Sequence, residues 1–183
     1  MVRKFVAIII VLLLIPIYLI VFLIILIDDG FPIFFIQKRI GKNNKEFNIF
    51  KFRTMKKSTP DKATHLLKNS KDFYNKCGPF LRKYSLDELP QLFNIVIGDL
   101  NFIGPRPALY NQDDLKALRT EKKIHLIKPG ITGWAQINGR DNISIEEKVD
   151  LDYYYMKNQS LLLDFKILLS TVYKILKSED VML

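Results

Sequence analysis

Residues 5–27 read FVAIIIVLLLIPIYLIVFLIILI, an apolar run without a single charged side chain. As one straight helix this run would reach about 35 Å, which is enough to cross the hydrocarbon core of a bilayer. A cleavable signal sequence fits poorly, because its apolar part is shorter and because Asp28-Asp29-Gly30 follows here in place of small residues. The sequence therefore predicts a membrane segment at residues 1–28 and a second domain at residues 29–183.

Pro16 lies at the centre of this run, with eleven apolar residues on each side. Proline removes a helical hydrogen bond and clashes with the preceding turn, so it predicts a kink, and each half would reach about 16 Å, roughly half the hydrocarbon thickness. Basic pairs flank the run, at Arg3–Lys4 and Lys38–Arg39. Since positive residues stay on the cytoplasmic side, these pairs favour a re-entrant helix that leaves the membrane on the side it entered. A kinked spanning helix is the alternative, because transmembrane helices tolerate proline.

The composition is basic, with 28 Lys and Arg against 19 Asp and Glu and a net charge of +9. This balance indicates an anionic partner, which could be nucleic acid, an anionic membrane surface or a phosphorylated substrate. Cys77 is the only cysteine, so the chain has neither an internal disulfide nor a cysteine-rich metal site. Its 183 residues are enough to build one hydrophobic core.

Beyond the membrane segment the patterns predict a short β-hairpin and several turn-rich loops. The hairpin is expected from the apolar residues 33–36, the turn GKNN at 41–44 and the partial alternation in 46–55. Residues 56–76 are polar and rich in lysine, which is typical of a surface segment. The proline- and glycine-containing segments 103–109 and 128–142 are interpreted as loops.

Helical spacing of apolar residues dominates the rest, so the predicted fold class is α+β and mostly helical. The predicted helices lie within residues 81–100, 111–127, 144–157 and 161–177. Ser144 and Glu147 match a capping box at the start of the third. The last has an apolar face and a lysine face, so it either packs on the core or lies as an amphipathic helix at the membrane interface.

Asp87 and Glu88 stand out because they are adjacent carboxylates inside the otherwise apolar stretch SLDELPQLFN, residues 85–94. The first interpretation is a helix start, since Ser85 and Glu88 match a capping box and acidic residues stabilise a first turn. Pro90 argues against it, because a proline at the fifth helical position would remove a hydrogen bond to Leu86 and cost on the order of 3 kcal/mol.

A helix that begins near Pro90 avoids this cost, because proline is favoured in the first turn. Asp87 and Glu88 would then project just ahead of the helix start. We expect the free N–H groups there to keep both carboxylates ionised. An ionised carboxylate is a candidate nucleophile or Mg²⁺ ligand.

Several cations lie in short, turn-flanked stretches that suit a phosphate site. They are Lys51, Arg53, Arg82, Lys83, Arg106 and Arg140. Arg106 lies between two prolines on a stiff loop, which favours bidentate phosphate binding. The alternative for each cation is an ordinary solvated or ion-paired surface residue.

Other ionisable residues carry weaker signals. His65 and His125 are isolated in lysine-containing helical stretches, although histidine is a frequent acid or base. Asp150 and Asp152, beside three tyrosines, could contribute to a polar site. We interpret them instead as one face of an amphipathic helix.

Three motifs in this order are similar to a known family. They are FNIFKFRTM at 47–55, LRKYSLDELPQLFNIVIGDLNFIGPRPAL at 81–109 and KPGITGWAQINGR at 128–140, and they follow the proline-centred apolar run. Together they resemble the bacterial sugar transferase family, and in particular its small monotopic phosphoglycosyl transferases. The resemblance covers nearly the whole chain.

The resemblance implies transfer of a sugar 1-phosphate from a UDP-sugar to polyprenyl phosphate, usually undecaprenyl phosphate, with release of UMP as the first step of glycan biosynthesis. It implies Mg²⁺ held by Asp87 and Glu88, with Asp87 as the nucleophile that forms a phosphosugar-aspartyl intermediate and Glu88 as its positioning partner. Arg106 would hold phosphate. Weaker assignments to substrate phosphate or nucleotide fall on Lys51, Arg53, Arg82 and Arg140. The implied location is the bacterial inner membrane, with the catalytic domain on the cytoplasmic face.

Two positions depart from the family's pattern. Ala7 stands where the family commonly has aspartate, and Ile15 stands where serine often precedes the proline and supports the re-entrant bend. A second hypothesis is a non-catalytic, membrane-anchored module that binds anionic lipid or nucleic acid through its net charge. The acid pair and the Pro-Arg-Pro loop have no obvious use in such a module, so nucleic acid is not the expected partner.

Overall fold

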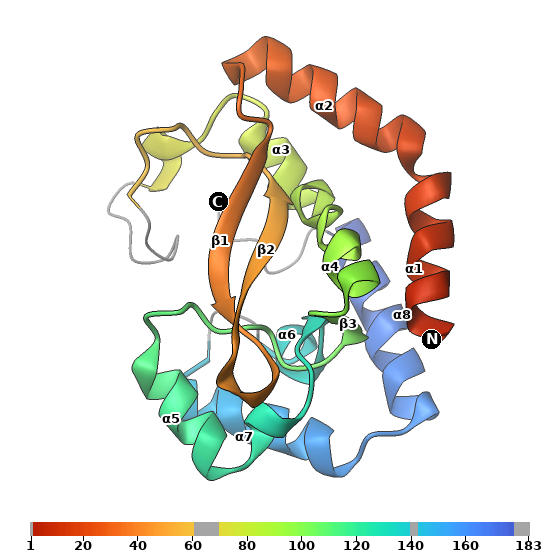
Figure 1. The fold of residues 1–183 in the computed structure, drawn as a ribbon, viewed down its shortest axis with the longest axis vertical. Coiled ribbons are helices and arrows are strands. Elements are labelled where there is room, and N and C mark those ends of the chain that lie inside the picture. Colours follow the sequence, from red (N-terminus) through yellow and green to blue (C-terminus); the bar gives the residue numbers. More distant parts are fainter. Residues whose placement is uncertain (1, 61–69, 140–142, 178–183) are drawn as a thin grey trace.

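The computed structural model describes residues 2–60, 70–139 and 143–177. Its helices are α1 (Val2–Leu13), α2 (Ile15–Asp29), α3 (Gly78–Lys83), α4 (Gln91–Ile97), α5 (Asp113–Glu121), α6 (Trp134–Ile137), α7 (Ile145–Lys157) and α8 (Leu161–Lys177). Its strands are β1 (Phe34–Ile40), β2 (Glu46–Phe52), β3 (Asn101–Ile103) and β4 (Gly130–Thr132). The mostly helical α+β class is confirmed. The hairpin lies in the middle, with α1 and α2 along one side and α5 and α7 at one end (Figure 1).

The two N-terminal helices meet at a sharp bend. Neither they nor any other described helix is long and apolar enough alone to cross a bilayer, whereas α1 and α2, bent by 60°, meet that test of length and composition as a pair. Pro16 lies in the first turn of α2, where proline fits, and the break falls just before it at Leu14. The predicted kink is therefore confirmed, and the bend forms with Ile15 in place of the family's serine. Re-entry into the membrane stays a prediction.

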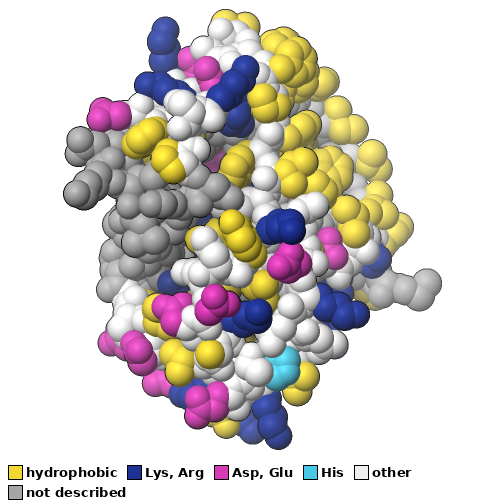
Figure 2. All heavy atoms as spheres, turned by 60° about the vertical axis from the view of Figure 1, so that its left-hand side comes forward, with side chains coloured by type: hydrophobic (Ala, Val, Ile, Leu, Met, Phe, Trp, Pro, Cys, Tyr) yellow, Lys and Arg dark blue, Asp and Glu magenta, His cyan; other side chains and the backbone are white. Residues whose placement is uncertain are grey.

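Most apolar side chains of α1 and α2 point away from the protein. Val2 and Ile27 are 76% and 84% exposed. Figure 2 shows hydrophobic side chains gathered along one upper edge of the molecule. A large exposed apolar surface indicates a partner that covers it.

A few residues of these helices instead enter the core. Ala7 is fully buried in a cluster with Ile49, Leu92 and Ile95, so α1 packs against α4 and β2. A small side chain at position 7 permits this close approach. Residues of α2 enter a second cluster with Phe52 and Leu81. The segments 1–28 and 29–183, which composition sets apart as two domains, thus share two buried clusters.

The hairpin is confirmed. Strands β1 and β2 pair antiparallel from Phe34 opposite Phe52 to Ile40 opposite Glu46. Asn43 and Asn44 in the turn have positive φ angles, which asparagine tolerates better than most residues. β1 extends beyond the apolar residues 33–36 from which it was predicted, because polar residues such as Lys38 continue the pairing with β2.

A second, parallel sheet was not predicted. β3 and β4 pair through Asn101 with Gly130 and Ile103 with Thr132. β4 lies inside the segment 128–142 that was interpreted as a loop, and β3 ends at Ile103, where the other predicted loop begins. Three-residue strands are too short to show alternation. Glycine permits the close approach, since a Cβ at Gly130 would lie 2.1 Å from the amide nitrogen of Gly104.

The C-terminal helices follow the sequence closely. Ser144 and Glu147 form the predicted capping box, with bonds of 3.1 and 2.9 Å between side chain and backbone N–H. α5 is shorter than the predicted helix 111–127, because Lys123 takes a left-handed conformation and a separate short turn follows. In α8 only Ile167 is buried among residues 161–177, and most of the apolar face is exposed.

Candidate active site

The acid pair lies on a short turn that precedes α4. Ser85 has a left-handed conformation and makes no capping hydrogen bond, so the capping box predicted at Ser85 is wrong. A 3₁₀ turn spans Leu86–Glu88, and α4 begins after Pro90, with φ −62° and ψ −14°. The second interpretation, a helix that starts at Pro90 with the carboxylates ahead of it, is confirmed.

Glu88 is held between two cations. Its Oε1 accepts hydrogen bonds from Lys51 Nζ at 2.8 Å and from Arg106 Nη2 at 3.1 Å. Lys51 comes from β2, and Arg106 comes from the loop after β3. All three side chains are largely buried, with 13% of Glu88, 14% of Lys51 and 27% of Arg106 exposed. Three segments distant in sequence therefore converge on one carboxylate.

Asp87 is only 6% exposed, and no cation of the described residues lies within ion-pair distance of it. Burial raises the pKa of Asp87 to about 6; Lys51 opposes the rise, Glu88 adds to it, and Arg82 and Arg106 oppose it. Desolvation is the largest effect on this carboxyl, and it acts against the ionised form that we expected the helix N–H groups to favour. A carboxyl with this pKa is still mostly ionised at neutral pH.

Burial also lowers the pKa of Lys51, although the neighbouring Glu88 opposes this. Burial thus raises the pKa of the acid Asp87 and lowers the pKa of the base Lys51, because in both cases it disfavours the charged form. Groups with shifted pKa values gather at functional sites more often than elsewhere. The cluster is therefore a candidate site on physical grounds.

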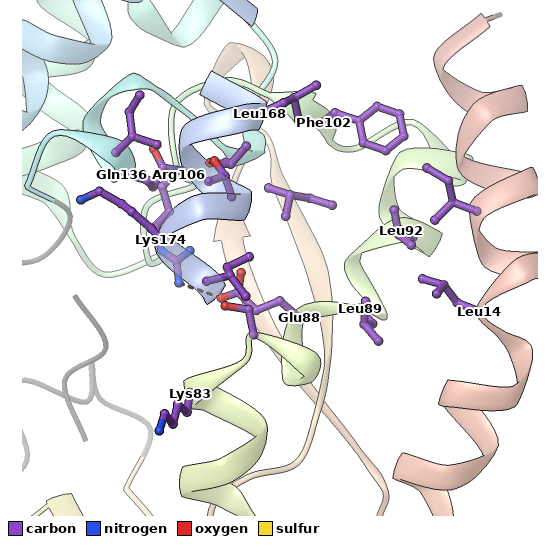
Figure 3. Close-up of a pocket in the computed structure, with 17 residues that line it drawn as sticks. Leu14, Lys83, Glu88, Leu89, Leu92, Phe102, Arg106, Gln136, Leu168 and Lys174 are labelled. Atoms are coloured by element: carbon purple, nitrogen blue, oxygen red, sulfur yellow. Dashed lines mark hydrogen bonds and ion pairs between the residues drawn. The ribbon is translucent and has the colours of Figure 1, made fainter. Parts of the chain in front are cut away.

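Two cavities open on either side of this cluster. The strand-side cavity, of about 500 Å³, lies along β1 and β2 and is lined by Lys51, Arg82 and Asp87 among others. The helix-side cavity, of about 320 Å³, is lined by Lys83, Glu88 and Arg106 together with residues of α1, α4 and α8 (Figure 3). Neighbouring residues thus face different cavities, and the Lys51–Glu88–Arg106 chain of ion pairs stands between them.

The Pro-Arg-Pro loop is fixed through its backbone. The carbonyl of Arg106 accepts a 2.8 Å hydrogen bond from Arg119, and the carbonyl of Pro107 accepts one of 3.2 Å from Arg39. Arg119 is in turn held by Asp152, which is 1% exposed and accepts bonds of 3.0 and 2.5 Å. Asp152 is therefore buried in an ion pair and does not lie on the polar outer face of an amphipathic helix, and no local pattern in the sequence indicates this pair.

Arg53 is used elsewhere. Its guanidinium pairs with the Asp29 carboxylate and donates to the carbonyls of Asp29, Gly30 and Pro32, at 3.0, 2.6 and 2.6 Å. It therefore fastens the C-terminal end of α2, although it also lines the strand-side cavity. Binding of substrate by Arg53 stays a prediction.

The other predicted residues fall into three groups. Arg82 lines the strand-side cavity and donates to the Tyr74 hydroxyl at 3.0 Å. Asp150 pairs with Lys122 at the surface, and His125 lies outside the cluster in the turn Ile124–Leu126. His65 and Arg140 lie outside the described residues.

The chain belongs to the bacterial sugar transferase family, whose family model matches residues 1–178. The uncharacterised sugar transferase EpsL of Bacillus subtilis is 49% identical over 154 residues, which cover 83% of this chain and 74% of that protein. An Aeromonas hydrophila relative named UDP-N-acetylgalactosamine-undecaprenyl-phosphate N-acetylgalactosaminephosphotransferase is 35% identical over 88% of this chain.

An Escherichia coli relative named UDP-glucose:undecaprenyl-phosphate glucose-1-phosphate transferase is 38% identical over 78% of this chain. The matches cover 39% of the Aeromonas protein and 32% of the E. coli protein, so this chain corresponds to a part of each. The family assignment made from the motifs is confirmed, and the chain is a transferase by its family.

Proposed function

We propose that the chain transfers a sugar 1-phosphate from a UDP-sugar to undecaprenyl phosphate and releases UMP. The observation that carries this proposal is the buried Asp87–Glu88 pair between two cavities, with Glu88 paired to Lys51 and Arg106. Two anionic substrates must meet in this reaction, and fixed cations reduce their repulsion. The names of the Aeromonas and E. coli relatives support the same class of substrates.

Asp87 is the proposed nucleophile. An ionised carboxylate oxygen attacks the sugar-bearing phosphorus, a P–O bond forms, and the P–O bond to UMP breaks with its electron pair leaving on UMP. A phosphate oxygen of the acceptor then attacks the same phosphorus and displaces Asp87. The acceptor is already charged, so this second step needs no general base.

Glu88 is a positioning residue in this mechanism. Its two ion pairs fix the turn that carries Asp87 and tie it to β2 and to the Arg106 loop. Arg106 is held through its own backbone, which leaves the guanidinium end pre-organised for phosphate. Lys51 and Arg82 supply further positive charge around Asp87.

The donor set fits Mg²⁺. Within the described residues no group of three or more metal-ligating side chains occurs, and Mg²⁺ in phosphate-transfer sites commonly takes one or two carboxylates and completes its shell with substrate phosphates and water. Asp87, which faces the strand-side cavity, and Glu88 would hold it. Bound Mg²⁺ would supply neutralisation of phosphate charge.

The test is release of UMP by the full chain in lipid nanodiscs with Mg²⁺, undecaprenyl phosphate and a panel of UDP-sugars. We expect UMP from at least one donor, and no product with Asp87→Asn. Asp113→Asn, a matched change on exposed α5, should retain activity. Release of UDP in place of UMP would contradict the reaction, and retained activity of Asp87→Asn would contradict the covalent step.

The second candidate function is a membrane-anchored module that binds anions without catalysis. The net charge of +9 favours it, whereas the converged acid pair does not. Salt-sensitive nucleic-acid binding near the micromolar range without turnover of any UDP-sugar would support this alternative.

The proposed location is the bacterial inner membrane, with the catalytic part on the cytoplasmic face. The bent pair α1 and α2 and their exposed apolar side chains support membrane contact. Labelling of a cysteine added before residue 2 tests the topology. Reaction from the cytoplasmic side alone supports re-entry, and reaction from the opposite side alone supports a spanning helix.

A further inference from the structure

The helix-side cavity has an apolar end and a cationic end. The apolar end lies against α1 and α4, where Leu14, Leu89, Leu92 and Phe102 line it (Figure 3). The opposite end carries Lys174 of α8 with Glu88, Arg106 and Gln136 (Figure 3). A nucleotide-sugar is polar along its whole length, whereas this arrangement suits an amphiphile with an anionic head.

The cavity is also continuous with an apolar surface. Leu168 lines it and is 41% exposed on α8, beside Leu169 and Val172, which are exposed as well. On the other side Ile10 and Leu14 lead to the exposed face of α1. A hydrocarbon chain too long for about 320 Å³ could therefore leave the cavity along apolar side chains and not into water.

The cationic end also contains an unpartnered polar group. Both the Nε2 and the Oε1 of Gln136 are buried without a hydrogen-bond partner among the described residues. A buried amide without partners is destabilising, so its presence in the wall indicates a group supplied by a ligand. A phosphate oxygen is an acceptor to which the Nε2 of Gln136 can donate.

We infer that the helix-side cavity binds the first isoprene units of the polyprenyl phosphate, with the phosphate held by Arg106, Lys174 and Gln136. This inference rests on the proposed function and assigns one substrate to one cavity. Glu88 lines this cavity and its neighbour Asp87 lines the strand-side cavity, so the phosphate would lie at the boundary of the two cavities, next to the proposed nucleophile. The strand-side cavity, lined by Arg82 and Asp87, is left for the nucleotide-sugar.

Two pairs of variants on α8 test the assignment. Leu168→Trp fills the cavity, and Leu169→Trp adds the same ring on the exposed face. Lys174→Ala removes a cation from the cavity, and Lys177→Ala removes one outside it. We measure initial rates of UMP release against undecaprenyl phosphate and against UDP-sugar, together with exchange of labelled UMP into UDP-sugar, which needs no acceptor.

We expect Lys174→Ala to raise the KM for undecaprenyl phosphate by about tenfold, because a charge-assisted contact is lost. Leu168→Trp should raise the same KM, because its ring occupies space for the isoprene units, and both variants should leave the exchange rate unchanged. The two control variants should match the wild type. An unchanged acceptor KM in both cavity variants, or an equal rise in both KM values, would overturn the assignment. Absence of UMP release by the wild type with every donor would instead count against the proposed function.

Photolabelling tests the cavity without turnover. A benzophenone-bearing polyprenyl phosphate should label peptides of α1 and α8 in the wild type, and excess undecaprenyl phosphate should prevent this while phosphatidylglycerol does not. Leu168→Trp should reduce the labelling, and Leu169→Trp should not. Labelling elsewhere, or equal competition by phosphatidylglycerol, would show that the cavity is no acceptor site.

Discussion

Replacing Lys51 by methionine removes one of the two cations that contact Glu88 and the strongest opposing charge on Asp87. A nearby opposite charge lowers a carboxyl pKa by about 1–3 units. We therefore expect the pKa of Asp87 to rise from about 6 to about 7 or higher. At pH 7 the ionised fraction would fall from about 90% to about half or less.

The assay is the pH dependence of the UMP exchange reaction, in which Asp87 is the proposed nucleophile. In the wild type the rate should fall as the pH drops through about 6, because the protonated carboxyl cannot attack. In Lys51→Met that midpoint should move up by at least one unit, and high pH should recover part of the rate. Lys51→Arg, which keeps the charge, should leave the midpoint near its original position.

Lys38→Met is the matched control, since Lys38 lies on the same hairpin in an exposed pair with Glu46. Its profile should coincide with that of the wild type. If Lys51→Met lowers the rate at every pH and leaves the midpoint unmoved, Lys51 acts on substrate phosphate and not on Asp87. That result would refute the electrostatic argument.

Three further predictions concern stability and positioning. Asp87→Asn should stabilise the fold by up to roughly 3 kcal/mol at pH 7, because the pKa of Asp87 is raised from 3.8 to about 6 and the wild type therefore loses stability as the pH rises from about 4 to about 6. The gain in Tm over the wild type should shrink as the pH is lowered toward 4. Arg119→Met leaves Asp152 buried without its partner, so we expect a loss of about 3–5 kcal/mol in unfolding free energy and, in any folded fraction, a raised KM for substrate; an unchanged Tm would contradict this. Arg53→Gln should lower the unfolding free energy by about 2–4 kcal/mol and speed proteolysis near Asp29, with the KM for UDP-sugar unchanged; a rise in that KM without loss of stability would instead place Arg53 at the substrate.

Local chemistry explains what could be predicted from sequence. Pro16 and Pro90 each fix one conformation, so the bend before α2 and the start of α4 follow from covalent geometry. The capping box of Ser144 and Glu147 depends on residues three apart. The acid pair could be identified without knowledge of its partners, because two adjacent carboxylates are unusual in an otherwise apolar stretch.

The features that sequence missed depend on contacts between distant residues. Arg119 and Asp152 are 33 positions apart, and no local pattern shows that they are buried together. The raised pKa of Asp87 comes from burial of its turn against β2, which the pattern of residues 85–94 does not contain. Arg53 looked like Arg106 in sequence, but only the fold shows that its donors face the end of α2.

The packing of Ala7 against α4 means that the N-terminal helices cannot be exchanged freely. A generic anchor can be exchanged for another apolar helix, because it touches only lipid. Here deletion of residues 1–28 would uncover Ile49, Leu92 and Ile95, which belong to the centre of the protein. The helices α1 and α2 are thus a structural part of the enzyme. Replacing or shortening them should expose the buried cluster and cause aggregation, whereas loss of a helix that served only as a membrane anchor would not.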